Sequence, residues 1–114
     1  MILLAVIEDL YFISHCARKS NNEMLFVCST DFLSVNVFNH IHLLAPSTQS
    51  NSQPFFLETS LTMKQDKEAA IIFQKLNKEK QSGYVFTEQL QRTYLMEIVH
   101  LITRVHGKNA LVKR

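Results

Sequence analysis

The sequence predicts an α+β fold, in which a few antiparallel β-strands precede an antiparallel pair of helices. Short apolar runs rich in β-forming residues fill the beginning of the chain, a Ser-rich stretch interrupts them, and apolar residues then recur at helical spacing. We therefore divide the chain into a β segment with a short helix and a loop (residues 1–54), a helical hairpin (55–108) and the start of a linker (109–114).

The strands are predicted within residues 1–28. The runs "LYFIS" and "MLFVCS" are rich in β-forming residues, and "MILLAVI" is short enough to favour a strand although its apolar residues show no period. Between the later two runs, Ser20, Asn21 and Asn22 favour a turn, because Asn tolerates the left-handed conformation and bonds to nearby backbone. We therefore expect two or three strands with a hairpin at residues 20–23.

The character of the sequence changes over residues 29–54. Ser29 or Thr30 is a candidate N-cap for a short helical turn or two. The apolar residues of that helix would be Phe32, Leu33, Val37 and Phe38. The stretch "APSTQSNSQP", bracketed by Pro46 and Pro54, is rich in Ser, Asn and Gln, and we expect it to form a surface loop.

Two helices are predicted after a short extended approach, "FFLETSL". Thr62 and Gln65 form a T-x-x-Q capping box, and the helix that they open runs to about Lys80. Its apolar face comprises Ala69, Ile72, Phe73 and Leu76. Ser82 and Gly83 mark the break before the next helix, so we expect an antiparallel hairpin with a tight joint.

The last helix carries the longest apolar stripe in the chain. The stripe comprises Leu90, Tyr94, Ile98, Leu101 and Val105, with Leu95, Val99 and Ile102 beside it. We expect Tyr94 and Ile98 to be buried against the apolar face of the preceding helix. Glu88 and Arg92 form an i,i+4 pair on the outer side, and Gly107 is the expected end of the helix.

Composition excludes several classes of function. A net charge of +2, with no basic block, argues against a nucleic-acid-binding surface. Two glycines argue against a nucleotide-binding fold and against a complete all-β barrel. Two cysteines, Cys16 and Cys28, are too few for a disulfide framework, so we expect free, buried thiols. The start "MILLAVIEDL" resembles neither a signal peptide nor a membrane span, which favours a cytoplasmic protein without a membrane partner.

The order of short patterns along the chain resembles a known family. "EDLYFIS" looks like that family's "GDLxxI" strand, with Glu8 where Gly is usual. A strand ending "FVCSTDFL", a Ser-rich loop, "PFFLETSLTM" and a helix with Leu76 and Glu79 follow, and "SGY" then opens a long helix with "YLMEIVHLITR". Over roughly residues 7–106, this order resembles the C-terminal half of the sensor domain of AraC-family bacterial transcription regulators.

The resemblance implies a fold, a function and partners. The strands would belong to a cupin-like barrel that encloses the effector, and the last helix would pack on the barrel's outer face and, in some members, against a second subunit. The family's upstream barrel strands and its helix-turn-helix domain have no counterpart in the sequence. We therefore expect a truncated regulator, with residues 109–114 as the start of the interdomain linker. It would have a partial pocket for a small-molecule effector, form a homodimer, and reach DNA only through the missing domain.

A second, mixed stripe on the last helix is the candidate dimer interface. It comprises Gln89, Thr93, Met96, His100 and Thr103. A solvated helix face is the simpler interpretation, whereas Met96 favours an interface because its adaptable apolar side chain suits one. If the helix pair is instead the whole functional surface, the chain is a stand-alone helical interaction protein.

A cupin-type metalloenzyme is a weaker alternative. His40-Ile41-His42 has the H-x-H spacing of cupin metal sites, in which alternate residues of a strand share a face. The nearest downstream carboxylate, however, is Glu58, beyond the loop. We therefore interpret these histidines as incidental and predict no metal or cofactor.

No catalytic constellation is predicted either. His15 and Cys16 are adjacent on an expected strand, so their side chains point to opposite faces. A catalytic cysteine paired with His100 or His106 has no supporting pattern. Glu88 and Glu97 are well separated on the last helix and are interpreted as solvated positions, and we predict that the protein is not an enzyme.

Overall fold

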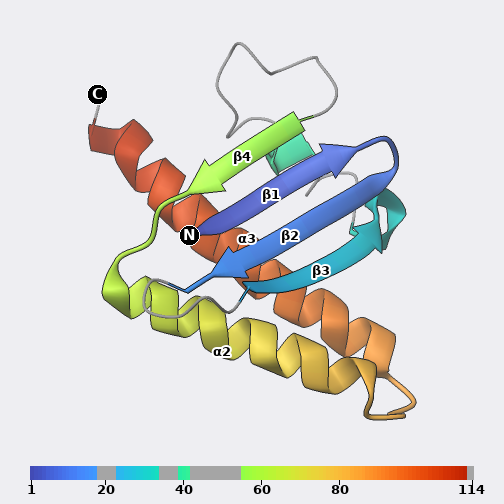
Figure 1. The fold of residues 1–114 in the computed structure, drawn as a ribbon. Coiled ribbons are helices and arrows are strands. Elements are labelled where there is room, and N and C mark those ends of the chain that lie inside the picture. The colour runs from blue at the N-terminus through green and yellow to red at the C-terminus, as the bar shows by residue number, and fades with distance from the viewer. Residues whose placement is uncertain (18–22, 34–38, 42–54, 113–114) are drawn as a thin grey trace.

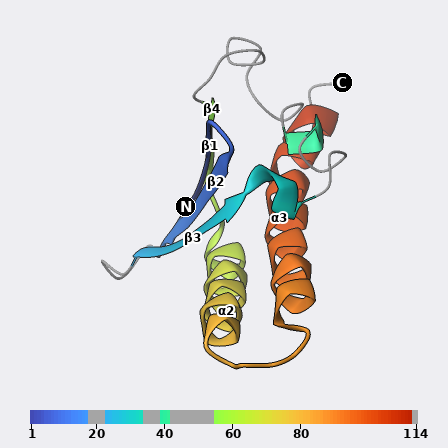
Figure 2. The same ribbon diagram turned by 90° about the vertical axis from the view of Figure 1, so that its right-hand side faces the viewer.

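The computed structural model describes residues 1–17, 23–33, 39–41 and 55–112 of the chain. A four-stranded antiparallel sheet lies in front of the last of two long helices, and the other helix runs beside that helix, below the sheet (Figure 1, Figure 2). The predicted α+β fold, with strands first and an antiparallel helix pair last, is confirmed.

The sheet has the strand order β3-β2-β1-β4. Its strands are β1 (Ile2–Ile7), β2 (Leu10–Cys16), β3 (Glu23–Ser29) and β4 (Phe55–Thr59). All neighbouring strands are antiparallel, and Leu4 pairs with Ile13 on one side and Leu57 on the other. The predicted strands before residue 30 are confirmed, whereas the predicted turn at residues 20–22 lies outside the described residues.

A two-residue turn, Glu8 and Asp9, joins β1 to β2. Ile7 pairs with Leu10 at the base of this hairpin. Glu8 has a φ of 55°, in the left-handed region that glycine adopts freely and other residues adopt at an energetic cost. The tight turn therefore fixes the register of β1 and β2 through a strained residue.

Strand β4 connects the two predicted segments of the chain. It pairs along β1, from Ile2 opposite Thr59 to Val6 opposite Phe55. The sequence predicted only a short extended approach to the helices here, because the local pattern does not encode a partner on the far side of a long connection. Residues 1–54 and 55–108 therefore share one sheet.

A 3-10 helix, η1 (Thr30–Phe32), follows β3. Ser29 is its N-cap, and the side chain of Ser29 accepts a hydrogen bond of 3.2 Å from the backbone N–H of Asp31. The predicted cap and first helical turn are confirmed, but Leu33, which was predicted to be helical, has an extended backbone and lies beyond the end of η1. Val37, Phe38 and the Ser-rich loop at residues 45–54 lie outside the described residues.

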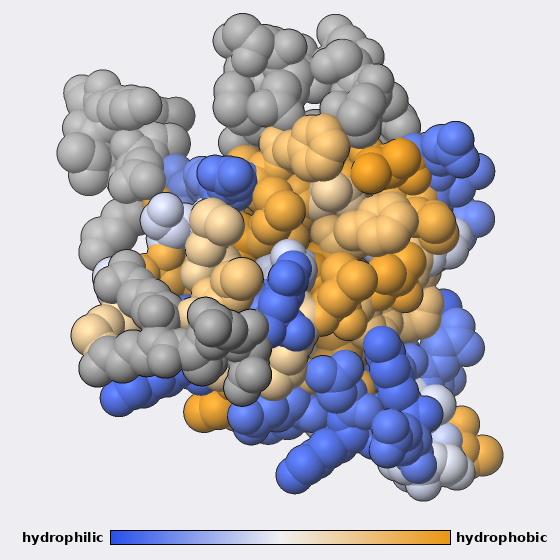
Figure 3. All heavy atoms as spheres, viewed as in Figure 1, coloured by the Kyte–Doolittle hydropathy of each residue, from blue (hydrophilic) through white to orange (hydrophobic). Residues whose placement is uncertain are grey.

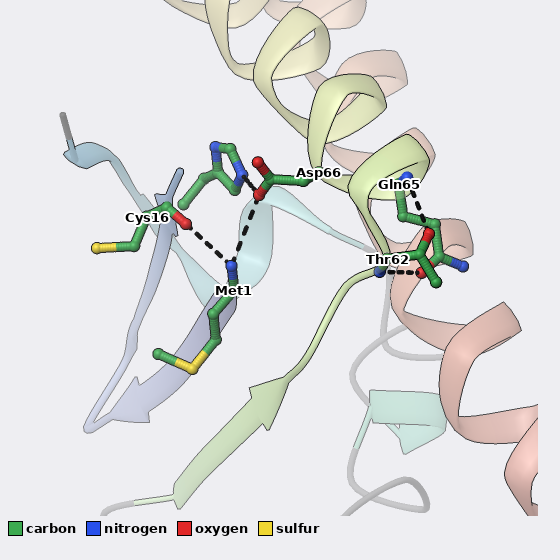
Figure 4. A network of polar contacts seen from close by, with 6 residues as sticks. Met1, Cys16, Thr62, Gln65 and Asp66 are labelled. Atoms are coloured by element: carbon green, nitrogen blue, oxygen red, sulfur yellow. Dashed lines mark hydrogen bonds and ion pairs between the residues drawn. The ribbon is translucent and has the colours of Figure 1, made fainter. Parts of the chain in front are cut away.

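Helix α2 (Met63–Lys80) begins at the predicted capping box and ends at the predicted residue. The Thr62 hydroxyl accepts a hydrogen bond of 3.2 Å from the Gln65 N–H, and the Gln65 side chain accepts one of 3.0 Å from the Thr62 N–H (Figure 4). At the far end of the helix, the Lys80 ammonium lies 4.6 Å from the centre of the buried Phe26 ring of β3. Both ends of α2 are thus fixed by specific contacts.

The joint between the helices is longer than predicted. Helix α3 (Thr87–Val112) begins well after Gly83, whose φ is 68°. The Glu79 carboxylate accepts hydrogen bonds of 2.8 Å from the hydroxyls of Ser82 and Thr87, which holds the joint together. The predicted antiparallel hairpin is confirmed with this wider connection.

The predicted C-terminal end of α3 at Gly107 is wrong, because the helix continues to Val112. Most of the predicted linker, residues 109–114, is therefore helical. A glycine inside a helix costs only about 1 kcal/mol relative to alanine, and Gly107 has no positive φ that would end the helix. Good helix formers such as Ala110 follow it, so the helix continues through the glycine.

The predicted i,i+4 pair on α3 is confirmed. The Arg92 guanidinium lies 2.9 Å from the Glu88 carboxylate. Its Nε also donates a hydrogen bond of 3.0 Å to the Phe32 carbonyl, and the guanidinium lies 4.9 Å from the centre of the Phe32 ring. Arg92 therefore connects α3 to η1.

The core lies between the sheet and the two helices. Ile98 is fully buried, together with Phe73 and Leu76 of α2, as predicted. Tyr94 is only half-buried, contrary to the prediction, and the Lys75 ammonium lies 5.8 Å from the centre of its ring. Tyr94 packs against the edge of the core, and its side chain keeps partial contact with solvent.

Candidate functional site

The face of the sheet turned away from the helices is the first candidate site. Side chains alternate across each strand, so every second residue points to this face. The strand register places these residues in two neighbouring rows. One row contains Val27, Phe12, Ala5 and Phe56, and the other contains Leu25, Ser14, Leu3 and Glu58. These eight residues, together with Ile7, Leu10 and Glu23, are called the outer face below.

Much of the outer face is apolar and open to solvent, although Ala5 and Ser14 on its two central strands are buried. Leu25 is 50% exposed and Phe56 is 43% exposed, and Ile7, Leu10 and Val27 are exposed to a similar degree. Figure 3, which views the molecule from the same side as Figure 1, shows apolar surface spread over the sheet. A contiguous apolar patch on a protein surface marks a place where a ligand or another surface binds.

Strand β1 contains the sequence signal for this surface. Strands that are covered on both faces read as continuous apolar runs, whereas strands with one wet face alternate. The run "MILLAVI" does not alternate. The lack of alternation between apolar and polar residues in this run therefore indicates a strand that is apolar on both faces of the sheet.

A groove between α2 and α3 is the second candidate site. Its volume is about 390 Å³, and its lining residues are Glu68, Ile71, Ile72, Glu97, His100, Leu101 and Arg104. Ile71, Ile72 and Leu101 are the apolar residues of this lining, and Ile71 is 53% exposed. Glu97 and Arg104 lie on the same side of α3, two helical turns apart, and the described residues give neither of them an ion-pair partner.

The five predicted dimer-interface residues do not form one uniform surface. Gln89, Thr93 and His100 are exposed, whereas Met96 and Thr103 are half-buried. Met96 packs against the core. The Thr103 hydroxyl donates to the Val99 carbonyl at 2.8 Å and lies 3.0 Å from His40 Nε2, so residues 39–41 lie beside this part of α3. Of the five, His100 lines the groove.

The H-x-H pattern does not lie on a described strand. Residues 39–41 are helical, and His42 lies outside the described residues. His40 is exposed and contacts Thr103, as described above. Among the described residues, no three His, Cys, Asp or Glu side chains are placed to hold a metal ion.

His15 and Cys16 point to opposite faces of the sheet, as predicted, and His15 belongs to a buried polar contact that the sequence did not indicate. The His15 side chain is 2% exposed, its Nε2 donates to the Asp66 carboxylate at 2.8 Å, and its ring stacks on Phe73. The amino group of Met1 lies 3.8 Å from the same carboxylate oxygen and donates to the Cys16 carbonyl at 2.9 Å (Figure 4). Asp66 thus joins the first turn of α2 to the sheet.

The remaining titratable groups do not form a catalytic pair in the described part of the chain. Both cysteines are free, but only Cys28 is buried as predicted; Cys16 is exposed, because its side chain points to the outer face near the end of β2. Burial raises the pKa of the Cys28 thiol to about 11, which disfavours the reactive thiolate. The Nε2 atom of His106 lies 3.0 Å from the Thr59 hydroxyl, within hydrogen-bond distance, and burial lowers the pKa of the His106 ring. Glu88 pairs with Arg92 and Glu97 lines the groove, so these carboxylates do not act together.

Comparison with known proteins gave no match: no family model, no curated protein and no solved structure is significantly similar to this chain. None of the described helices combines the length and the apolar character that a membrane span requires. The geometry of the outer face and of the groove therefore carries the functional argument.

Proposed function

We propose that the chain is the effector-sensing and dimerisation part of an AraC-type transcription regulator. The observation that carries the proposal is the difference between the two sides of the sheet. A helix pair packs on one side, and an apolar outer face is open on the other. This is the arrangement expected for part of a cupin-like barrel, with helices outside and the effector side inside.

The turn between β1 and β2 gives the proposal independent support. In the resembled pattern "GDLxxI", the first residue is usually glycine, and in this chain it is Glu8. Glu8 has the left-handed backbone conformation that glycine favours. The backbone geometry at this position therefore agrees with the residue type of the pattern, although the side chain differs.

The groove supports a homodimer through its charge pattern. Glu97 and Arg104 both line the groove on α3, together with the apolar residues Ile71, Ile72 and Leu101. If α3 of a second copy packs antiparallel to α3 of the first, Glu97 of each copy lies opposite Arg104 of the other copy. A two-fold interface must be self-complementary in this way, and the apolar residues Ile71 and Leu101 would supply the buried centre.

Charge reversal in the groove tests the dimer. We expect sedimentation to give a dimer, Glu97→Arg or Arg104→Glu alone to shift it towards monomer, and the double variant to restore it. The matched control is Asp31→Lys, a charge reversal at an exposed position on η1 outside the groove. A double variant that is weaker than both single variants, with circular dichroism unchanged, would contradict the proposed pairing.

A repressor-fusion assay tests whether the chain can act as the dimerisation domain of a transcription regulator. The full chain replaces the dimerisation domain of a repressor whose DNA-binding domain represses only as a dimer. We expect repression from the wild-type fusion and its loss with Ile71→Asp, since a charge at this exposed position in the groove blocks the apolar contact. Repression that is equal for both fusions would contradict dimerisation through this groove.

A stand-alone interaction protein is the second candidate. Tyr84, Val85 and Phe86 are exposed at the joint of the hairpin, and the Tyr84 and Phe86 rings meet edge to face 5.7 Å apart. Such a tip favours contact with another protein. Under this alternative, the chain stays monomeric at all concentrations, and the charge reversals have no effect on sedimentation.

A further inference from the structure

The charges on the outer face are all of one sign. Of the residues that the described strands direct to this face, Glu23 and Glu58 are acidic, and none is Lys, Arg or His. An anionic group that settled on this surface would lose its hydration and find no positive partner. A cationic group would find a carboxylate.

Glu58 is the carboxylate placed to receive a cation beside an apolar body. It lies on β4, opposite Leu3 and two residues from Phe56, which shares its face. Two residues of a strand span about 6.5 Å, so the carboxylate and the ring lie within the reach of one small molecule. The Phe56 ring is itself attractive to a cation through its π face.

The apolar part of a ligand has a continuous floor beside this carboxylate. The row that contains Phe12, Ala5 and Phe56 crosses three neighbouring strands. Ser14 lies in the neighbouring row with Glu58 but is only 8% exposed, so Glu58 is the polar group that this part of the face offers to a ligand. The site would therefore suit an amphiphile with one charged end, because the apolar row and the Phe56 ring lie beside the Glu58 carboxylate.

We infer that the outer face binds a small amphiphilic cation, with an apolar chain or ring on the Phe12–Phe56 row and a protonated amine at Glu58. This inference rests on the proposed sensing function and names the chemical class of its effector. It assigns the recognition of charge to Glu58 and that of apolar surface to Phe56. Ligands with a carboxylate or phosphate are disfavoured.

Three probes with the same apolar chain test this inference: octylammonium, 1-octanol and octanoate. Binding to the full chain is followed by NMR, through the amide shifts of the outer-face residues. We expect octylammonium to bind most tightly and octanoate most weakly. Glu58→Gln should weaken octylammonium about two- to fivefold, as for an exposed ion pair, and leave octanol unchanged. The matched control is Glu88→Gln, which removes a carboxylate on α3.

The outcomes separate the ligand class from the proposed function. If octylammonium and octanol bind equally and Phe56→Asp weakens octanol, the outer face is a binding surface but the cation preference is overturned. Tighter binding of octanoate overturns it as well. If none of the probes shifts the outer-face signals, both the ligand class and the sensing function are overturned.

Discussion

The two faces of the sheet are built from the same strands and are both apolar, yet only one of them is covered by described elements. The inner face packs on α2 and α3, and its residues Leu4, Ile13 and Phe26 are buried. The outer face leaves Leu25 and Phe56 about half exposed. An apolar strand face therefore indicates that something covers it in the working protein, but it does not indicate what.

Helices α2 and α3 pack on the inner face alone because each has a single strongly apolar stripe. The stripe of α2 comprises Ala69, Phe73 and Leu76, and all three are buried. The inner face also has a polar contact, because His15 of β2 is directed at Asp66 in the first turn of α2. The comparison thus predicts large effects of inner-face variants on stability and small effects of outer-face variants.

Truncation of the core gives the largest expected effect. Ile98→Ala should lower the free energy of unfolding by about 2–5 kcal/mol, because Ile98 is fully buried between the helices and the sheet. Leu25→Ala on the outer face should change it by no more than about 0.5–1 kcal/mol, since that side chain is half exposed. Urea unfolding measures both, and equal losses would mean that the outer face is covered in solution.

Removal of the buried polar contact gives an intermediate effect. Asp66→Ala leaves the buried His15 Nε2 without this acceptor, which should lower the free energy of unfolding by about 1–3 kcal/mol. Asp66→Asn retains an acceptor oxygen and should lose less. Thermal unfolding of the two variants distinguishes them, and an Asp66→Ala protein as stable as the wild type would show that the contact does not hold α2 to the sheet.

The smallest expected effect is a pH dependence at the edge of the inner face. Burial lowers the pKa of His106 below its ordinary value of 6.5. The unfolded chain therefore binds the proton at a higher pH than the folded chain, and the contribution of His106 to stability is complete above pH 6.5 and is lost below it. His106→Gln should flatten the melting temperature between pH 7 and pH 5 relative to the wild type, while His100→Gln, on the exposed side of α3, should not.

The sequence predicted the features that depend on local patterns. The capping box of Thr62 and Gln65 and the pair of Glu88 and Arg92 lie within a turn or two of helix, so their spacing alone specifies them. The end of α3 was missed because Gly107 is a stop signal only when the backbone turns left-handed, and here it does not.

The features that the sequence did not predict depend on contacts between distant residues. The pairing of β4 with β1 brings Thr59 opposite Ile2, and the contact between His15 and Asp66 joins a strand to a helix. Neither has a local pattern. The contact between Thr103 on α3 and His40, a residue from elsewhere in the chain, has no local pattern either.

Solvent access to the side chains of the sheet tests the central claim most directly. A water-soluble nitroxide attenuates the NMR signals of methyl groups that it can approach. We predict strong attenuation for Leu25 and Val27 of β3 on the outer face and little for Leu4 of β1 and Ile13 of β2 on the inner face of the same sheet. Equal protection of all four methyl groups would contradict it, because the outer face would then be closed and could not receive an effector.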